Sequence, residues 1–470
     1  MTLIEIFNNI ADAIRNKLSD NNKIIPANMP TSIDKIIDGS NGSYKLNITT
    51  FPNAIVTFTY YKSGDAVTQK TTTANSSGIA TIYFNNSDSK GIYEIKINDG
   101  DNVYYTSYNF SLTLTESLNY KYNGVEKYNG SINSLSENKE RLSAASVGSY
   151  ALFAGGGIYN NTAYATVDTY NNTLSKSTAT DLSVARYGLC SANINNYCLF
   201  GGGSSVNYSS KNTVDSYNSS LVKGTPIELN TGVYDGAATN VGVYAIFAGG
   251  FSGSSSPSNS IATYNSSLSK GIADALSVAR GNLAATSNSK YALFAGGGEK
   301  TVNYGGTTNI VDSYSTSLAH STAKNLRYNI SMLSGIQFKN YALFAGGMSV
   351  EDNSISGSDT IRIITGYNTS LTESLISNLD RSRYDLAIAV IGSYAIFGGG
   401  ENYSNGSVTD VDVLDGDFTH YKGIPFRYRK YHLAATSVGN YAIFAGGLIT
   451  EKGFTTRTDT LDIYTNKLVI

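Results

Sequence analysis

The sequence offers few residues for catalysis or for metal binding. Its histidines are His320, His420 and His432, and we take them to occupy unrelated places in the repeats described below. A metal centre built from several histidines is therefore not expected. Cys190 and Cys198 stand where other repeats carry alanine, on adjacent predicted strands. Either a cross-strand disulfide or two small buried thiols would fit them, and we favour buried thiols.

Aspartates gather in one short stretch of the sequence and at first suggest cation ligands. They are Asp410, Asp412, Asp415 and Asp417. However, Asp412 occupies the repeat position that Asp168 and Asp215 hold elsewhere, and Asp415 with Gly416 lies at an ordinary turn of the repeat. We therefore interpret the group as structural and predict neither a metal site nor a cofactor.

Two sets of residues are candidates for ligand binding. The basic ones recur near the start of a repeat: Arg186, Arg280, Arg383 and Lys430. The aromatic ones lie in loops of variable length: Tyr159, Tyr208, Tyr304 and Tyr403, with Phe251 and Phe454. Aromatic faces beside guanidinium and polar groups suit a glycan or an anionic polymer. The alternatives are that the basic residues brace the fold by hydrogen bonds and that the tyrosines are bystanders.

These candidates are positioned by a phrase of the form Tyr-Ala-Leu/Ile-Phe-Ala/Gly-Gly-Gly, which occurs seven times. The copies begin at Tyr150, Tyr197, Tyr244, Tyr291, Tyr341, Tyr394 and Tyr441. They are 47, 47, 47, 50, 53 and 47 residues apart. Periods of this size indicate supersecondary units that bury their apolar faces only against neighbouring units.

Length variation within the repeat is confined to one connection. A second phrase, Val-Asp-Thr-Tyr170 and its later copies, always precedes the next first phrase by 27 residues. The segment from the paired glycines to the second phrase varies from 14 to 20 residues. Loops absorb length changes at little cost and carry binding groups, so this connection is the predicted place for a variable function.

Each repeat contains four predicted strands, of which the first is rich in alanine and the second ends in paired glycines. Small residues on the first strand fit a narrow central axis, and the glycines permit close backbone approach between neighbours. The last copy has no room for a fourth strand, whereas roughly residues 131–140 precede the first copy. We predict that they supply it and close a seven-bladed β-propeller over residues 120–470.

Two further segments precede the repeats. Residues 1–40 are predicted to be a helical docking or oligomerisation segment, with a helix over 2–18 that begins in a capping box and a second short helix from Ser32 to Ile37. A helical hairpin packed on its own domain is the alternative. Residues 43–118 alternate in the strand manner and predict an immunoglobulin-like β-sandwich of about seven strands. The predicted fold class is therefore all-β.

Composition excludes several functions. Charged residues make up 15% of the 470, the formal net charge is −2, and no long basic run occurs, so nucleic-acid binding is not expected. No run of about 18 apolar residues and no secretory signal is found, so membrane insertion and ordinary secretion are not expected.

The N-terminal residues Ile10-Ala-Asp-Ala-Ile-Arg-Asn-Lys17, Ile25-Pro-Ala-Asn-Met-Pro30 and Ile33-Asp-Lys-Ile36 resemble a leader on tail and fibre proteins of phages and prophages of Gram-positive bacteria. The resemblance covers about 35 residues. It implies assembly into a virion or tail-like particle, made in the bacterial cytoplasm without a signal peptide. It also implies that the N-terminus contacts a tail or baseplate protein, and we expect a homo-oligomer, with a trimer favoured.

The repeats resemble kelch repeats over about 340 residues. The apolar strand ending in paired glycines, the later Val-Asp-x-Tyr, and Arg186, Arg280 and Arg383 match that pattern. Lys430 replaces the arginine of the last repeat, and the usual kelch tryptophan is absent, with Leu174, Leu221 and Leu268 near its place. The Tyr, His and Tyr-Cys set of copper oxidases built on kelch propellers and the Asp-box turns of sialidases are not found, so no enzyme activity is expected.

Together these patterns predict a non-enzymatic receptor-binding protein or tail fibre. The N-terminal segment would dock, the sandwich would act as a spacer, and the propeller would bind a host surface saccharide or wall polymer. An intracellular kelch-type protein-interaction scaffold is the alternative. A carbohydrate-active enzyme with a carboxylate pair is a more remote one.

Overall fold

The computed structural model describes an all-β chain. The described residues are 32–38, 43–49, 53, 55–62, 65–77, 79–85, 91–98, 103–110, 125–128, 132–158, 161–254, 256–298, 306–350, 358–402, 406–451 and 454–466. Residues 1–129 and 130–470 form two compact units. The predicted helix over 2–18 lies outside the described residues. In the described part of the chain, no helix is long and apolar enough to cross a membrane.

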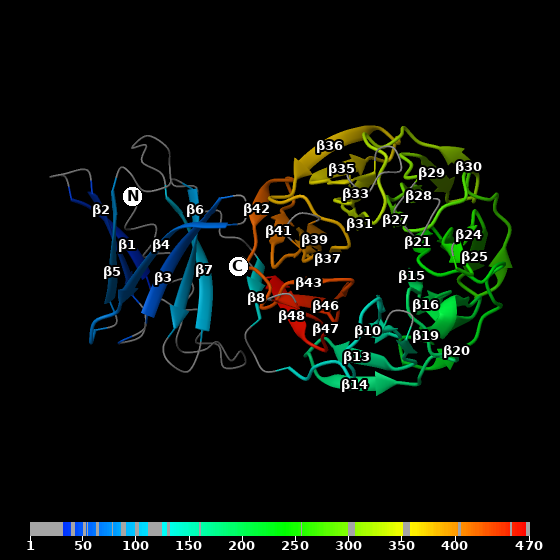
Figure 1. The fold of residues 1–470 in the computed structure, drawn as a ribbon, viewed down its shortest axis with the longest axis horizontal. Helices are drawn as coiled ribbons and strands as arrows, with labels where there is room; N and C mark the ends of the chain where they lie inside the picture. The colour runs from blue at the N-terminus through cyan, green and yellow to red at the C-terminus, as the bar shows by residue number, and fades with distance from the viewer. Residues whose placement is uncertain are drawn as a thin grey trace. The chain divides into compact units, whose positions relative to one another are not determined.

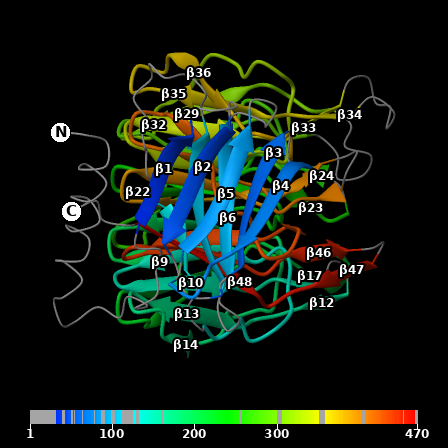
Figure 2. The ribbon, with the colours of Figure 1, turned by 90° about the vertical axis from the view of Figure 1, so that its left-hand side faces the viewer.

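Ahead of β8 (Val125–Lys127), the first unit has two antiparallel sheets built from seven strands, with the orders β1-β2-β5 and β4-β3-β6-β7. Figure 2 shows β1, β2 and β5 side by side. The strands are β1 (Ser32–Asp38), β2 (Ser43–Thr49), β3 (Ile55–Lys62), β4 (Asp65–Thr73), β5 (Ile79–Asn85), β6 (Gly91–Asn98) and β7 (Val103–Phe110). Val56 and Phe58 of β3 and Ala80 and Ile82 of β5 are buried, so each sheet has an apolar face.

The prediction of a second helix from Ser32 to Ile37 is wrong. These residues form β1, and Ile33 pairs with Ile48 of β2 in an antiparallel register. Three β-branched isoleucines favour an extended strand once a neighbouring strand supplies the backbone hydrogen bonds. The sheet therefore begins before residue 43, where the sandwich was predicted to start.

The second unit is a series of four-stranded antiparallel sheets, one for each repeat (Figure 1). The first strands of the repeats are β9 (Ser143–Val147), β15 (Cys190–Ile194), β21 (Ala237–Val241), β27 (Ala284–Ser287), β31 (Ser334–Phe338), β37 (Ala387–Ile391) and β44 (Ala434–Val438). The second strands are β10 (Tyr150–Ala154), β16 (Tyr197–Gly201), β22 (Tyr244–Ala248), β28 (Tyr291–Ala295), β32 (Tyr341–Ala345), β38 (Tyr394–Gly398) and β45 (Tyr441–Ala445). Each second strand carries the first repeated phrase.

The third strands carry the second phrase and the fourth strands form the outer edge. The third strands are β13 (Val167–Asn171), β19 (Val214–Asn218), β25 (Ile261–Asn265), β29 (Val311–Ser315), β35 (Ile363–Tyr367), β41 (Val411–Leu414) and β48 (Leu461–Asn466). The fourth strands are β14 (Lys176–Ala179), β20 (Lys223–Gly224), β26 (Lys270–Gly271), β30 (His320–Thr322), β36 (Glu373–Asn378), β42 (His420–Lys422) and β8 (Val125–Lys127).

The variable connection between the second and third strands mostly folds as a small hairpin. The hairpins are β11 (Gly157–Ile158) with β12 (Thr162–Ala163), β17 (Ser204–Ser205) with β18 (Ser209–Ser210), β23 (Phe251–Ser252) with β24 (Ser256–Pro257), β33 (Met348–Val350) with β34 (Ser358–Thr360), β39 (Glu401–Asn402) with β40 (Gly406–Ser407), and β46 (Leu448–Glu451) with β47 (Phe454–Arg457). A short helix, η1 (Val206–Tyr208), joins β17 to β18, and β43 (Lys430–Tyr431) pairs with β46.

The seven sheets stand around one axis. Their first strands contact one another in a cycle that includes β44 against β9, and they line a shared cavity of about 320 Å³. The lining is mostly alanine, serine and glycine, as predicted from the small residues of the first strands. The cycle is made by separate sheets that pack side by side, and no single sheet runs around it.

The last sheet gains its fourth strand from a different segment than predicted. Its order is β44-β45-β48-β8, so Val125–Lys127 supplies the outer strand. Residues 132–139 form no strand, although the amides of Leu135 and Lys139 donate to the carbonyl oxygens of Asp459 (2.9 Å) and Thr458 (3.4 Å). The described residues 132–140 thus contribute irregular backbone contacts, and the prediction that the segment 131–140 forms the strand is wrong.

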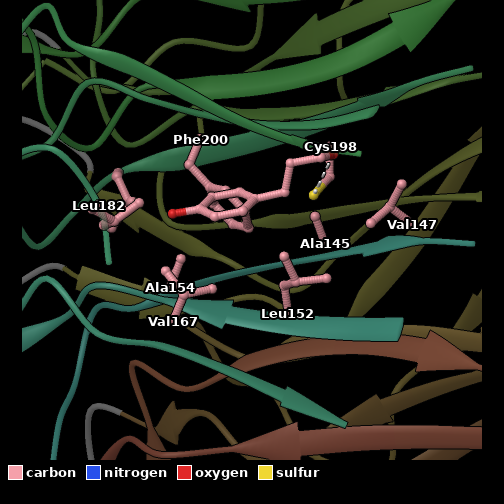
Figure 3. Packing of buried hydrophobic residues seen from close by; sticks show 10 residues of the cluster. Ala145, Val147, Leu152, Ala154, Val167, Leu182, Cys198 and Phe200 are labelled. Carbon is pink, nitrogen blue, oxygen red and sulfur yellow. Dashed lines mark hydrogen bonds between the residues drawn. The ribbon is translucent and has the colours of Figure 1, made fainter. Parts of the chain in front are cut away.

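The apolar core lies between neighbouring sheets. In Figure 3, Cys198 and Phe200 of β16 face Leu152 and Ala154 of β10 from the preceding repeat. The same packing recurs between the following repeats. The paired glycines bring backbones together there, because a Cβ on Gly202 would lie 2.6 Å from the carbonyl oxygen of Val233 in the next repeat. The predicted role of these glycines is confirmed.

A tyrosine on most third strands ties its sheet to the segment that precedes its repeat. Tyr217 is fully buried, its ring meets Phe200 edge-on at 6.1 Å, and its hydroxyl donates to the carbonyl oxygen of Thr180 at 2.7 Å. Five other repeats make the same hydrogen bond, and Leu414 replaces the tyrosine in the sixth.

Replacing Tyr217 by phenylalanine should lower the free energy of unfolding by about 1 kcal/mol, because the carbonyl of Thr180 loses the donor hydroxyl while the ring packing stays. Urea denaturation measures this loss. The matched control is Tyr328→Phe, whose ring is 46% exposed. Equal stability of the two variants would show that the buried hydrogen bond contributes nothing.

Candidate functional site

The four predicted basic site residues lie inside the second unit. Arg186, Arg280, Arg383 and Lys430 are all 0% exposed. The Arg186 guanidinium donates to Asp215 Oδ2 at 2.8 Å and to the carbonyl oxygen of Phe200 at 3.1 Å. A fully buried side chain offers no surface to a ligand, so the prediction that these four residues bind a ligand is wrong. The alternative, that they stabilise the fold by hydrogen bonds, fits their contacts.

In each repeat the two positions hold either a complete buried ion pair or no charged residue at all. The pairs are Lys139–Asp168 (3.1 Å), Arg186–Asp215 (2.8 Å), Arg280–Asp312 (2.6 Å), Arg383–Asp412 (2.6 Å) and Lys430–Asp462 (2.6 Å). In the third repeat both positions are apolar, Val233 with Ala262, and in the fifth they are Ile330 with Thr365. No repeat keeps one member of the pair alone, which is what the high cost of a lone buried charge requires.

The buried carboxylates receive further support from outside the pair. Asp215 also accepts hydrogen bonds from the amide (3.1 Å) and hydroxyl (2.6 Å) of Ser183, and Lys223 lies 3.2 Å from it. Burial acts to raise the pKa of Asp215, but the Ser183 hydrogen bonds and the Arg186 charge outweigh it and hold the pKa below its usual value. Asp215 is therefore ionised at neutral pH.

The variant Arg186→Val should lose about 3 kcal/mol of unfolding free energy, since it leaves the Asp215 carboxylate buried without its arginine. Adding Asp215→Ala copies the third repeat and should restore most of that loss. Chemical denaturation of the two single variants and the double variant completes a double-mutant cycle. Additive losses would refute the pairing.

The second residue after the basic position forms a ring around the axis. Its members are Arg141, Gly188, Asp235, Asn282, Met332, Asp385 and His432, and all have positive φ. The amides of six members donate to the carbonyl of the preceding member at 2.8–3.1 Å, among them Arg141 to His432 across the junction between the last and first repeats. We call these seven residues the axial ring.

Side chains of the axial ring place two adjacent cations, His432 and Arg141, between two aspartates across that junction. His432 Nε2 lies 2.9 Å from Asp385 Oδ2, and Arg141 donates to Asp235 Oδ2 at 2.7 Å. Arg141 passes over Gly188, where a Cβ would lie 2.6 Å from Asp235 Oδ1. The close approach of the Asp235 carboxylate favours a glycine there, whereas the positive φ is shared by the six other members.

His432 also joins the first repeat to the last. Its Nδ1 lies 3.2 Å from Glu140 Oε2, and Arg457 donates to the other oxygen of Glu140 at 3.2 Å. Burial and the Arg141 charge act to lower the pKa of His432, but Asp385 and Glu140 outweigh them and raise it above its usual value. The imidazolium therefore stabilises the closed ring.

Because the folded-state pKa of His432 is raised, its contribution to stability is complete below the ordinary histidine pKa and is lost as pH rises through the raised value. His432→Asn copies Asn282 of the ring, and asparagine tolerates positive φ. The stability difference between the wild type and this variant should be largest in mild acid and should shrink toward alkaline pH. Thermal melts across pH measure it, and a constant difference would contradict the assignment.

The predictions for the aromatic residues of the loops differ in outcome. Tyr159, Tyr304 and Tyr403 lie outside the described residues. Tyr208 is half-buried in η1 with φ of 54°, and its ring lies 6.4 Å from that of Tyr234. Phe251 does not join a surface, because it is 0% exposed beneath Tyr234. Phe454 begins β47. Of the predicted aromatic set, Tyr208 is thus the described candidate for ligand contact.

Isolated backbone bridges support the prediction that the variable loops and the starts of the repeats share one face. Tyr187 pairs with Ser204 and Tyr234 pairs with Phe251, so the start of one repeat adjoins the hairpin that follows its second strand. The variable hairpins and the axial ring consequently lie at the same end of the sheets. The buried basic residues precede the axial ring by two positions in the chain, so their backbone lies near this end of the sheets. Their side chains, however, point inward to the aspartates of the third strands.

Of three expectations about smaller groups, one is wrong and two hold. His320 and His420 occupy equivalent positions rather than unrelated ones, because each begins a fourth strand and lies against the aspartate of its third strand, at 2.7 Å from Asp312 and 2.6 Å from Asp412. Cys190 and Cys198 are free thiols, and burial raises the pKa of both to about 12. Asp415 caps its turn by accepting from the amides of Asp417 and Thr419, as predicted.

Comparison with known proteins gives a likeness of fold alone. No protein-family model matches the sequence, and no curated protein matches it. Among solved structures, 232 chains match. One of them, titled "Structure of YjhT", has a TM-score of 0.48 and 12% sequence identity, and the match covers 62% of this chain and 99% of that one. Similarity at this level carries no argument about function.

Proposed function

We infer that the second unit is a divergent, kelch-like, seven-bladed β-propeller and that the two sheets of the first unit form an immunoglobulin-like spacer. The cyclic contacts of the first strands, the four-stranded sheets and the shared axial cavity support the propeller. The seven strands in two antiparallel sheets support the spacer.

The function that these features favour is attachment of a phage or tail-like particle to a host surface saccharide or wall polymer. The observation that carries it is the confinement of length variation to hairpins at one end of the sheets, where Tyr208 stands half-buried on a backbone with positive φ at Asn207 and Tyr208. Strained, variable loops on a rigid scaffold are typical of ligand-contacting segments.

The aromatic pair at this position has a physical basis for sugar binding. The Tyr208 ring offers one partly exposed face, and the buried rings of Tyr234 and Phe251 fix it from beneath at 6.4 Å and then 6.0 Å. A ring held in place in this way loses little conformational entropy when an apolar sugar face stacks on it. Several such sites on a homo-oligomer would give avidity.

Replacing Tyr159, Tyr208, Tyr304 and Tyr403 together by alanine should abolish binding to intact Gram-positive cell walls and leave the melting temperature within a few degrees. Tyr208→Ala alone should weaken binding. The control is Tyr83→Ala, since Tyr83 is 56% exposed on β5 of the first unit. Undiminished wall binding by the fourfold variant would remove the proposed surface.

An intracellular protein-interaction scaffold predicts the opposite preference, with retention of soluble host proteins and none of the wall. A carbohydrate-active enzyme predicts release of reducing sugar from purified wall. Sedimentation of the protein with walls, followed by a reducing-sugar assay on the supernatant, distinguishes the three.

A further inference from the structure

Three side chains of the sixth repeat converge in an arrangement that no other part of the described chain repeats. The potential metal-binding atoms of Asp380, Asp412 and His420 all lie within 4.8 Å of one another. His420 Nε2 lies 2.6 Å from Asp412 Oδ1 and 3.9 Å from Asp380 Oδ1. The amide of Asp380 donates to the same Asp412 oxygen at 2.8 Å, which fixes the two aspartates relative to each other.

The equivalent positions in other repeats show what is unusual here. In the second repeat they hold Ser183, Asp215 and Lys223, so that one carboxylate faces an outer ammonium. The fourth repeat holds Ser277, Asp312 and His320. Only the sixth combines a second carboxylate with a histidine in place of lysine, and it therefore gains a negative charge while losing a permanent positive one.

Neighbouring cations pair with the carboxylates around the cluster. Arg383 holds the other oxygen of Asp412 at 2.6 Å. Arg381 pairs with Asp410 at 3.2 Å, and Lys422 stays 3.9 Å from Asp380 and 4.0 Å from Asp410. Burial and the charge of Asp412 raise the pKa of Asp380 above its usual value. Burial and Asp412 thus destabilise the charged form of Asp380.

We propose that Asp380, Asp412 and His420 bind a divalent transition-metal ion of the Zn²⁺ type. One imidazole nitrogen and two carboxylate oxygens are ligands that Zn²⁺ accepts, with water completing the coordination. The Asp380 side chain is 33% exposed and gives the ion access, whereas that of Asp412 is 1% exposed and is held by Arg383, which acts as an outer-shell partner. The ion takes the place that the lysine ammonium occupies in the second repeat.

The chain supplies its own control variants. Asp380→Ser recreates the serine of the fourth repeat, and His420→Lys recreates the lysine of the second. Calorimetric titration of the full chain with ZnCl₂ should give one site, and each variant should bind at least about tenfold more weakly while melting cooperatively without metal. Binding of the wild type should weaken below neutral pH, because His420 must lose its proton before it ligates.

A gain of function gives the converse test. Ser277→Asp builds the second carboxylate beside Asp312 and His320, and it should add a second equivalent of Zn²⁺. Co²⁺ absorption in the visible range reports coordination by the new ligands independently of the calorimetry. Zn²⁺ binding that survives both Asp380→Ser and His420→Lys, or a wild type that binds no Zn²⁺ at micromolar concentration, would overturn the proposal.

Discussion

The closure of the cycle of sheets is the constraint on which the second unit depends. Each sheet has two apolar faces, and each face is buried only by the neighbouring sheet, so an open array would leave two faces and two strand edges in water. The last contact, of β44 against β9, joins segments almost 300 residues apart in sequence. At that junction Glu140 meets His432 and Arg457, and the amide of Arg141 meets the carbonyl of His432.

The repeats fill the same two buried positions in two ways, with an ion pair or with uncharged side chains. A charge pair such as Arg280 with Asp312 gives direction and hydrogen bonds, whereas Val233 with Ala262 gives only packing. Desolvation makes the net gain of a buried pair small, so a repeat can change between the two solutions with little change in stability, provided that both residues change. A single change leaves a lone buried charge, which explains why no intermediate occurs among the seven repeats.

Much of the fold could be predicted from the sequence because repetition reveals register. The phrase around Tyr197 fixed its strand, and the small residues near Ala284 fixed the side that faces the axis. Spacing alone could not show the direction of a long side chain, and so Arg186 was assigned to a surface although it turns inward to Asp215.

The secondary structure of short segments was also predicted wrongly. Ser32 to Ile37 looked helical until β2 provided a partner, and Val125–Lys127 is too brief to be recognised as a strand. The histidines were misjudged although their spacing shows a shared register, because His320 follows Asp312 and His420 follows Asp412 by the same eight residues.

The axial ring has an electrostatic consequence for the entrance that it encircles. Its amide-to-carbonyl links run head to tail in one rotational sense, so the peptide dipoles lie tangentially and their components largely cancel. The backbone therefore contributes almost no field along the passage, unlike the end of a helix, where aligned dipoles add. The potential at this opening is therefore set by charged side chains, among them Arg141, Asp235, Asp385 and His432, and a change of one proton on the imidazole alters it.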